Sequence, residues 1–342
     1  MDLRRVIGCL RPVALVVFAA LIQCGCATPA LDSARHNFYA GKYDKANETL
    51  DEAGVPAKDK VLFLMERGTV RLASGKYETS ARDYIDASDE LEKLETYSVS
   101  KGAASWVAND TVEDFRGTPY ERTLLHAFAA KDHLALANWD NAAVEARRII
   151  ISLDDKVRGD YPEDAYSRYM AGFCLEMIDD DSNAALQYRR VAHLIPELKV
   201  DENTGRVSFA PSTNAAANAI PPPPEGKAWS QELVCFVLLG RSARATDVWR
   251  DDWQPGEPLY AEISHKGKLL GRSYNLADTV DLAYTTDQIE AVRKMIKTVG
   301  RVMVKEAIAD QIEENNNELL GQLVRFVLIG LLERPDLRRW EP

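Results

Sequence analysis

The stretches GKYDKANETLDEA (residues 41–53) and GKYETSARDYIDA (residues 75–87) share one pattern, and the second begins 34 residues after the first. Both open with Gly-Lys-Tyr and continue with small and apolar residues at helical spacing. Self-similarity at a period of this size indicates stacked helix–turn–helix units, because one such unit cannot bury its apolar face alone. The pair therefore predicts a helical array around residues 41–87.

A period of 34 residues is that of the tetratricopeptide repeat (TPR). The matched positions are turn residues, aromatic residues that cover the turn and small residues that let two helices approach, namely Gly41 and Gly75, Tyr43 and Tyr77, and Ala46 and Ser80. Gly68 lies in the preceding helical stretch, where the repeat requires a small residue at the helix crossing. These positions predict that residues 41–53 and 75–87 each form the second helix of a repeat.

Two further units follow in the same register. Residues 122–150 carry Trp139 at the tyrosine position and Ala142 at the close-packing position, and residues 165–196 carry Gly172, Ala184 and a closing Pro196. We expect a mainly α fold, a TPR-like α-solenoid, followed by a small β-containing unit and C-terminal helices.

An insertion near residues 98–121 breaks the period. Its last part runs into NDTVEDFRGTPYER (residues 109–122), a stretch of acids, Gly and Pro that helix packing does not require. Together with the repeats and a Cys-Gly-Cys sequence (residues 24–26) after an apolar N-terminal run, this stretch resembles a family of TPR-containing bacterial lipoproteins. RPDLRRWEP (residues 334–342) is also similar to a Trp-centred segment of that family. The resemblance implies a fold and a location, but no reaction.

The first residues have the layout of an export signal. Three arginines precede the apolar stretch 12–22, which is too short to span a bilayer, and small residues follow it. Cys26 follows Gly25, as a lipoprotein signal peptidase requires, whereas Cys24 follows the bulkier Gln23. The pattern predicts lipidation at Cys26. The alternatives are an ordinary secretory signal or a short anchor; a metal-binding pair would need further Cys or His ligands at suitable spacing.

Composition fits a folded body tethered to a membrane. The chain has 342 residues, is 46% hydrophobic and carries a net charge of -11, which argues against nucleic acid as a partner. We expect a signal peptide at 1–25, a repeat domain at 26–205, a Pro-rich linker at 206–227 and a small α+β domain at 228–342. Cys174 and Cys235 are expected to be buried free thiols.

The second half predicts a small β unit and two helices. ELVCFVLLG (232–240) has the length of a buried strand, and LYAEIS (259–264) and LLGRSYNLA (269–277) flank a turn as a hairpin. A helix is expected from Thr285 to the break at ENNN (314–317). The apolar stretch 319–332 is expected to be a core helix, or one that lies on the membrane or grips a partner.

The search for catalytic chemistry finds no constellation. HExxH, GxSxG and GxxxxGK[ST] are absent from the sequence. Ser98 and Lys101 match the SxxK pattern of penicillin-recognising enzymes without its companion motifs, and His126 and His133 lack further ligands. We therefore predict no enzyme activity, no cofactor and no metal site.

Recognition of a partner remains. In TPR proteins the first helix of each unit lines a concave groove, and the repeat register places on that side Phe38, Tyr39, Met65, Thr69, Lys131, Tyr166, Tyr169, Phe173 and Met177. The last four form an aromatic stripe suited to a helix or an extended peptide, unless the stripe packs on the linker or the C-terminal helices. A second candidate site comprises Arg116, Tyr120, Glu121 and Arg122, which could instead form ion pairs that hold the insertion.

The sequence thus predicts a lipid-anchored, non-enzymatic scaffold that binds another envelope protein or a peptide segment. Wall synthesis, outer-membrane assembly and export are the processes it would serve. Ala27 after Cys26, in place of a retaining Asp, favours the outer membrane, facing the periplasm. The alternatives are an envelope glycan- or peptidoglycan-acting enzyme and a membrane-active or pore-assembling lipoprotein that uses residues 319–332.

Overall fold

The computed structural model describes residues 29–55, 57–98, 113–209, 233–242, 260–315, 322 and 338–342. Over these residues the protein is mainly helical, which confirms the predicted fold class at that level. The expected signal peptide, Cys26, most of the insertion, the proline run and the stretch 319–332 apart from Gln322 lie outside the described residues.

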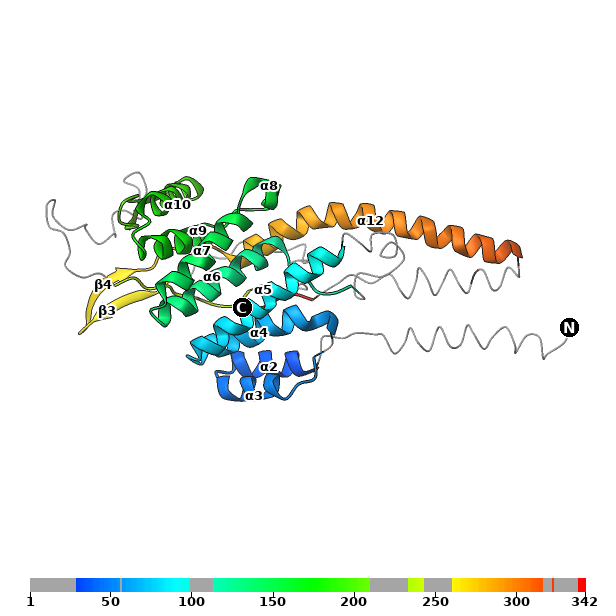
Figure 1. Ribbon diagram of the computed structural model, residues 1–342, viewed down its shortest axis with the longest axis horizontal. Helices are drawn as coiled ribbons and strands as arrows, with labels where there is room; N and C mark the ends of the chain where they lie inside the picture. Colours follow the sequence, from blue (N-terminus) through cyan, green and yellow to red (C-terminus); the bar gives the residue numbers. More distant parts are fainter. Residues whose placement is uncertain are drawn as a thin grey trace.

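Eight helices form four antiparallel hairpins that follow one another along the chain (Figure 1). The hairpins are α2 (Pro29–Tyr39) with α3 (Tyr43–Asp51), α4 (Lys60–Ala73) with α5 (Tyr77–Ser98), α6 (Pro119–Ala135) with α7 (Trp139–Ser152), and α9 (Ala165–Glu176) with α10 (Asp181–Leu194). Two short helices lie between them, η1 (Ala57–Asp59) and α8 (Asp155–Arg158). The second helices of the first three hairpins begin at the predicted aromatic residues.

All four hairpins use the same turn. Gly41, Gly75, Ala137 and Asp179 each adopt a positive φ, between 55° and 72°. In each turn the next backbone N–H donates to a carbonyl five residues earlier, at 2.8, 2.9, 2.9 and 3.0 Å. This is the Schellman ending of a helix, which favours glycine because a Cβ crowds the left-handed conformation. The common geometry explains the Gly-Lys-Tyr pattern of the first two units.

Two glycines let paired helices approach closely. A Cβ on Gly68 would lie 2.8 Å from the ring of Tyr84, and a Cβ on Gly172 would lie 2.7 Å from the ring of Tyr188. Both tyrosines are fully buried. The two hairpins α4–α5 and α9–α10 are therefore built around the same glycine–tyrosine contact, as the sequence register predicted for Gly68.

The second half of the chain packs on the hairpins. Leu282 and Ala283, near the start of α12 (Thr279–Asn315), and Trp340 belong to the same apolar core as Leu31 and Leu50. The far part of α12 then extends beyond the hairpins along the long axis of the molecule (Figure 1). Described residues on both sides of the predicted boundary at 228 thus share one core.

Four short strands form two separate hairpins. β1 (Leu198–Val200) pairs with β2 (Val207–Phe209), and β3 (Glu262–His265) pairs with β4 (Lys268–Arg272), both antiparallel. The second hairpin confirms the one expected around residues 259–277. The expected buried strand at 232–240 is wrong: residues 233–239 form no strand, and most of their side chains are exposed.

Two further expectations are corrected. The long helix begins at Thr279, six residues before Thr285, because Asp278 caps it by accepting a hydrogen bond from the Val280 N–H at 2.8 Å. Its described part runs to Asn315, and the rest of the predicted break at 316–317 lies outside the described residues. Cys174 is buried as expected, but Cys235 is exposed because segment 233–239 turns only one large side chain inward.

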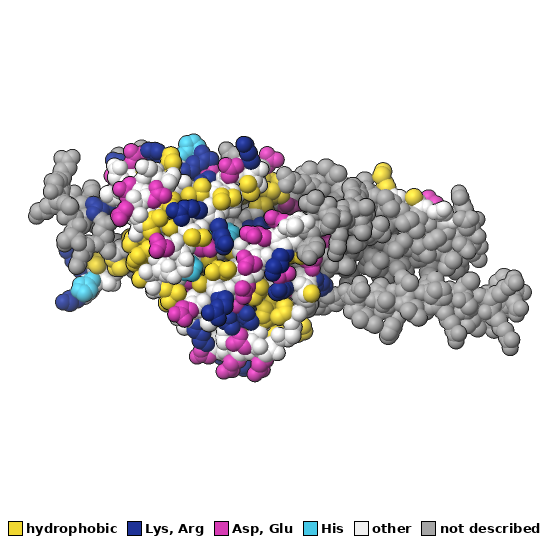
Figure 2. Space-filling view, viewed as in Figure 1, with side chains coloured by type: hydrophobic (Ala, Val, Ile, Leu, Met, Phe, Trp, Pro, Cys, Tyr) yellow, Lys and Arg dark blue, Asp and Glu magenta, His cyan; other side chains and the backbone are white. Residues whose placement is uncertain are grey.

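The surface in view carries no large area of one charge. Figure 2 shows acidic and basic side chains interspersed over the helical hairpins. Arg67 and Arg71 of α4, for example, both form ion pairs with Asp83 of α5, at 2.7 Å each. Such ion pairs join neighbouring helices. The groove between the hairpins is therefore the candidate site.

Candidate functional site

Residues 338–342 lie in the groove lined by α4, α5 and α6, and Trp340 is their anchor. The Trp340 side chain is 0% exposed. Its ring packs edge-on against Phe128 and Tyr84, with centroids 5.2 and 6.1 Å away, and its Nε1 donates a hydrogen bond to Thr69 Oγ1 at 3.0 Å. The pocket thus satisfies both the apolar body and the polar edge of the indole.

Two buried carboxylates hold the backbone of this segment. Glu121 Oε1 accepts a hydrogen bond from the Trp340 N–H at 2.8 Å, and Glu66 Oε1 accepts one from the Glu341 N–H at 3.1 Å. Arg35 bonds to the same Glu66 oxygen, at 3.0 Å from Nε, and forms an ion pair with Glu341 at 3.0 Å. The groove therefore recognises an extended main chain as well as its side chains.

Arginines fix the residues before Trp340. Arg338 forms an ion pair with Asp59 at 2.7 Å and donates to the Glu113 carbonyl at 2.8 Å. Arg339 forms an ion pair with Asp287 of α12 at 2.5 Å. These contacts connect residues 338 and 339 to three separate parts of the chain.

Burial alters the acidity of the carboxylates in this groove. Desolvation raises the pKa of both Glu66 and Glu121 above the ordinary value for glutamate, although hydrogen bonds and arginines oppose the shift. For Glu66 the opposing partner is Arg35, and for Glu121 it includes the backbone N–H and hydroxyl of Thr118. The two acids are built into the fold and face this chain's own segment.

The second predicted site supports the same arrangement. Glu121 and Thr118 form a capping box that starts α6, and Arg122 donates to the Arg116 carbonyl at 2.9 Å and pairs with Glu95 at 2.6 Å. Tyr120 is buried. These contacts agree with the structural alternative for the set of Arg116, Tyr120, Glu121 and Arg122, and Glu121 adds the bond to Trp340.

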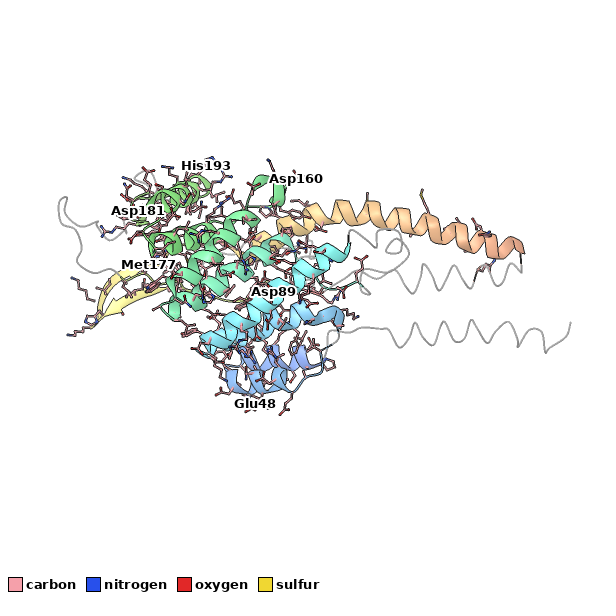
Figure 3. The ribbon with its side chains drawn as sticks, in the orientation of Figure 1. Glu48, Asp89, Asp160, Met177, Asp181 and His193 are labelled. Atoms are coloured by element: carbon pink, nitrogen blue, oxygen red, sulfur yellow. The ribbon has the colours of Figure 1, made fainter. Side chains whose placement is uncertain are left out.

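The aromatic stripe is covered by a different segment of the chain. The Phe236 ring lies 6.3, 6.2 and 5.4 Å from the rings of Tyr166, Tyr169 and Phe173. Tyr169 also donates a hydrogen bond to the Gly205 carbonyl at 2.8 Å. Met177, the last residue of the predicted stripe, is 37% exposed at the end of α9 (Figure 3). One aromatic side chain therefore covers three members of the stripe.

The remaining predicted residues lie around these two segments. Met65 is fully buried in the core, whereas Thr69 accepts the indole hydrogen bond of Trp340. Tyr39 donates to the Glu341 carbonyl at 3.2 Å, and burial raises the pKa of this tyrosine to about 12. Phe38 and Lys131 line a cavity of about 1440 Å³ between the groove and segment 233–242. Thr69 and Tyr39 thus contact the chain's own residues 338–342, whereas Met65 belongs to the core.

Sequence reasoning missed the residues that occupy the groove. Trp340 was noted only for its resemblance to a family segment, and Phe236 was assigned to a buried strand. Arg35 and Glu66 gave no signal, because one charged residue on each of two helices is ordinary for a solvated face. A buried Glu within an apolar helix such as VLFLMERGTVRLA was the available hint.

No group of three His, Cys, Asp or Glu side chains that could hold a metal ion occurs in the part of the chain that the structure describes. His126 pairs with Glu145 at 2.8 Å, but no group of three metal-ligating side chains converges. Lys101 lies outside the described residues, as does the side chain of Ser98. Among the helices described, none is long and apolar enough to cross a membrane.

Comparison with protein families, with curated proteins and with solved structures finds no match to this chain.

Proposed function

We propose that this protein is a lipid-anchored, non-enzymatic scaffold of the bacterial cell envelope that binds a segment of another envelope protein through a TPR-like array. The four helical hairpins with one shared turn geometry support the array. The repeated contacts of Gly68 with Tyr84 and of Gly172 with Tyr188 support it further. Membership of the TPR-containing lipoprotein family is part of the same proposal.

One observation carries the binding function. The groove holds residues 338–342 by an aromatic anchor and by side chains that accept backbone N–H groups. Main-chain hydrogen bonds with a pocket for one large side chain are the usual means of recognising an extended peptide. Because the groove binds a segment of its own chain in this way, it has the chemistry to bind a segment of a partner protein at the end that residues 338–342 do not occupy.

That other end is where we place the partner. Segment 233–239 covers the stripe through Phe236, while Leu233, Leu238 and Leu239 expose their side chains. Exposed apolar residues gathered beside a groove are typical of interaction surfaces. A partner segment would bind along residues 233–239 and the exposed end of the stripe at Met177.

Site-specific photocrosslinking in the native envelope tests this placement. A photoreactive amino acid at Met177 should capture one defined protein, and the same substitution at Ile151, which is 62% exposed on α7 away from the groove lining, should not. Replacing Leu238 by Asp should remove the Met177 product, because a charge does not enter an apolar contact. Equal products from Met177 and Ile151 would reject the proposed surface.

The anchor has its own test. Cys26→Ser should abolish incorporation of a labelled fatty acid, and Cys24→Ser should leave it intact, because only Cys26 follows a small residue. Fractionation of the envelope then reports whether the labelled protein lies in the outer membrane. Labelling that survives Cys26→Ser would remove lipid anchoring at this residue from the proposal.

A further inference from the structure

A large, partly open cavity lies beneath segment 233–242, and more of its wall is apolar than polar. Its volume of about 1440 Å³ exceeds the roughly 300–1,000 Å³ usual for small-molecule sites. The groove helices contribute Leu72, Leu124 and Phe128, and Phe236 and Val280 close it from other parts of the chain. Such a wall suits a long apolar chain, because each buried methylene stabilises binding by about 0.8 kcal/mol.

The charged groups of this wall are mostly basic, although the whole chain carries a net charge of -11. The described residues that line the cavity include Lys131, Arg206, Arg241 and Arg272, with Asp278 as their one acid. Asp278 is already engaged, since it caps α12. The electrostatic character of the cavity therefore favours an anion.

Lys131 and Tyr166 are the polar groups that lack partners there. None of the described carboxylates forms an ion pair with Lys131, and burial lowers the pKa of its ammonium group. The Tyr166 hydroxyl is buried without a hydrogen-bond partner among the described residues, and burial raises its pKa, so it stays a donor. The adjacent Asp132 opposes the effect of burial on Lys131 but forms no ion pair with it. A partly buried cation without an ion pair and an unused donor both favour an anionic ligand.

The two groups come from adjacent helices. Lys131 lies on α6 and Tyr166 on α9, which pack against each other, and both residues line the cavity. Arg241 and Arg272 stack on Tyr39 and Tyr260 instead, with 6.0 and 3.6 Å from guanidinium to ring centroid. Lys131 is thus the cation best placed to meet a ligand inside the apolar part of the wall.

We propose that this cavity binds an amphiphile with an apolar chain and a single anionic headgroup, a carboxylate or a phosphate, held by the Lys131 ammonium and the Tyr166 hydroxyl. The apolar chain lies between the groove helices and Phe236. This binding does not depend on the protein partner proposed above.

Photolabelling of the full chain in phosphatidylcholine vesicles tests the proposal. The probe is palmitic acid that carries a diazirine in its chain, and mass spectrometry identifies the labelled peptides. Labelling of peptides from the cavity wall should saturate with probe concentration. Unlabelled palmitate or hexadecyl phosphate should compete, the stronger of the two identifying the headgroup, whereas hexadecanol should compete poorly.

Matched variants separate the headgroup contact from general damage. Lys131→Met keeps an unbranched side chain as far as the ε-carbon but removes the ammonium group, and it should raise the apparent Kd for the probe about 10-fold or more, because the hydrogen bond to the charged headgroup is lost. Lys131→Arg should retain binding, and Tyr166→Phe should weaken it several-fold. Lys45→Met, on the exposed face of α3, should change nothing.

Three results would overturn the proposal. The first is labelling of the cavity peptides that does not saturate, because the probe then samples the bilayer alone. The second is hexadecanol competing as well as palmitate. The third is Lys131→Met labelling like the unaltered protein while circular dichroism shows the same helical content for both.

Discussion

Two segments of this chain lie against the helical hairpins in opposite ways, residues 338–342 against α4, α5 and α6 and residues 233–239 against α9. Residues 338–342 are bound by Glu66, Glu121 and Thr69 through hydrogen bonds of 2.8–3.1 Å, and Trp340 is completely buried. Residues 233–239 touch the groove mainly through the half-buried Phe236, and Leu233 is 79% exposed. We refer to residues 338–342 as the anchor segment and to residues 233–239 as the cover segment.

The difference indicates that the anchor segment is part of the fold, whereas the cover segment can be replaced. The anchor segment completes a core that includes Leu31 and Leu282, so its removal would leave a cavity and take one hydrogen bond from each of the buried carboxylates Glu66 and Glu121. The cover segment leaves apolar side chains in water, which a partner or a ligand could bury. The free energy of unfolding of variants in the two segments tests this contrast.

The largest effect is expected at the anchor. Trp340→Ala should lower the free energy of unfolding by about 3–5 kcal/mol, because it removes a fully buried indole packed on Phe128 and Tyr84. Chemical denaturation followed by circular dichroism measures this loss. Leu238→Ala in the cover segment, where the side chain is exposed, should stay within about 0.5 kcal/mol. Equal losses from the two variants would abolish the distinction between anchor and cover.

The wall behind the anchor should respond next. Gly68→Ala places a Cβ 2.8 Å from Tyr84, whose ring also contacts Trp340, so the ring must shift. We expect a loss of about 1–3 kcal/mol, as for overpacked cores. Gly54→Ala is the matched control, because no atom lies within 4 Å of the added methyl group. A Gly68→Ala protein as stable as the control would show that the helix crossing tolerates more bulk than the geometry indicates.

A buried acid near this wall gives a pH dependence. Asp132 on α6 is fully buried, and neither carboxylate oxygen has a hydrogen-bond partner among the described residues, since the nearby Ser80 hydroxyl donates to the Gly68 carbonyl. Burial raises the pKa of Asp132 from 3.8 to about 7. The folded state therefore binds a proton more tightly than the unfolded state, and this contribution to stability is lost as the pH rises from about 4 through 7.

Asp132→Asn should remove that dependence. At pH 8 the variant should be more stable than the unaltered protein by roughly 1–3 kcal/mol, because the asparagine carries no charge to desolvate. At pH 4.5 the difference should shrink, since Asp132 is then protonated in the folded protein. Denaturation curves at the two pH values measure both numbers. A loss of stability on Asp132→Asn at pH 8 would mean that the carboxylate has a stabilising partner.

The sequence predicted individual helices better than contacts between distant segments, and particular residues show why. Tyr43, Tyr77 and Trp139 were correctly placed at helix starts, because the repeat pattern is local and its period is visible. The shared turn geometry at Ala137 and Asp179 was not visible, because only the first two turns carry glycine. The predicted groove residues came from register, which depends only on position along each helix and does not separate a core residue such as Met65 from a surface one.

The groove's occupants could not be found in this way. The bond between Trp340 and Thr69 joins residues 271 positions apart, and no local pattern records such a pairing. The cover segment was misassigned because an apolar run of strand length reads the same whether a sheet buries it or water reaches it. Tertiary structure decides whether LVCFVLL pairs with a neighbouring strand, and in this protein residues 233–239 form no strand.

A smaller change in stability than at the anchor is expected at Phe236, and thiol labelling can resolve it. Phe236→Ala should cost about 1 kcal/mol, because the ring is half-buried and three aromatic neighbours remain packed on the helices. The adjacent Cys235 is exposed and should react with N-ethylmaleimide in the native protein, whereas Cys174 is buried and burial raises its pKa to about 12. Peptide mass spectrometry distinguishes the two thiols.

Phe236→Ala should therefore leave labelling of Cys174 slow, since the core around α9 stays closed. If the cover segment instead contributes to the fold as the anchor segment does, losing Phe236 would accelerate modification of Cys174 along with unfolding. The two cysteines thus report separately on opening of the cover and opening of the core. If a partner can displace the cover segment, the two thiols must be modified by N-ethylmaleimide at independent rates.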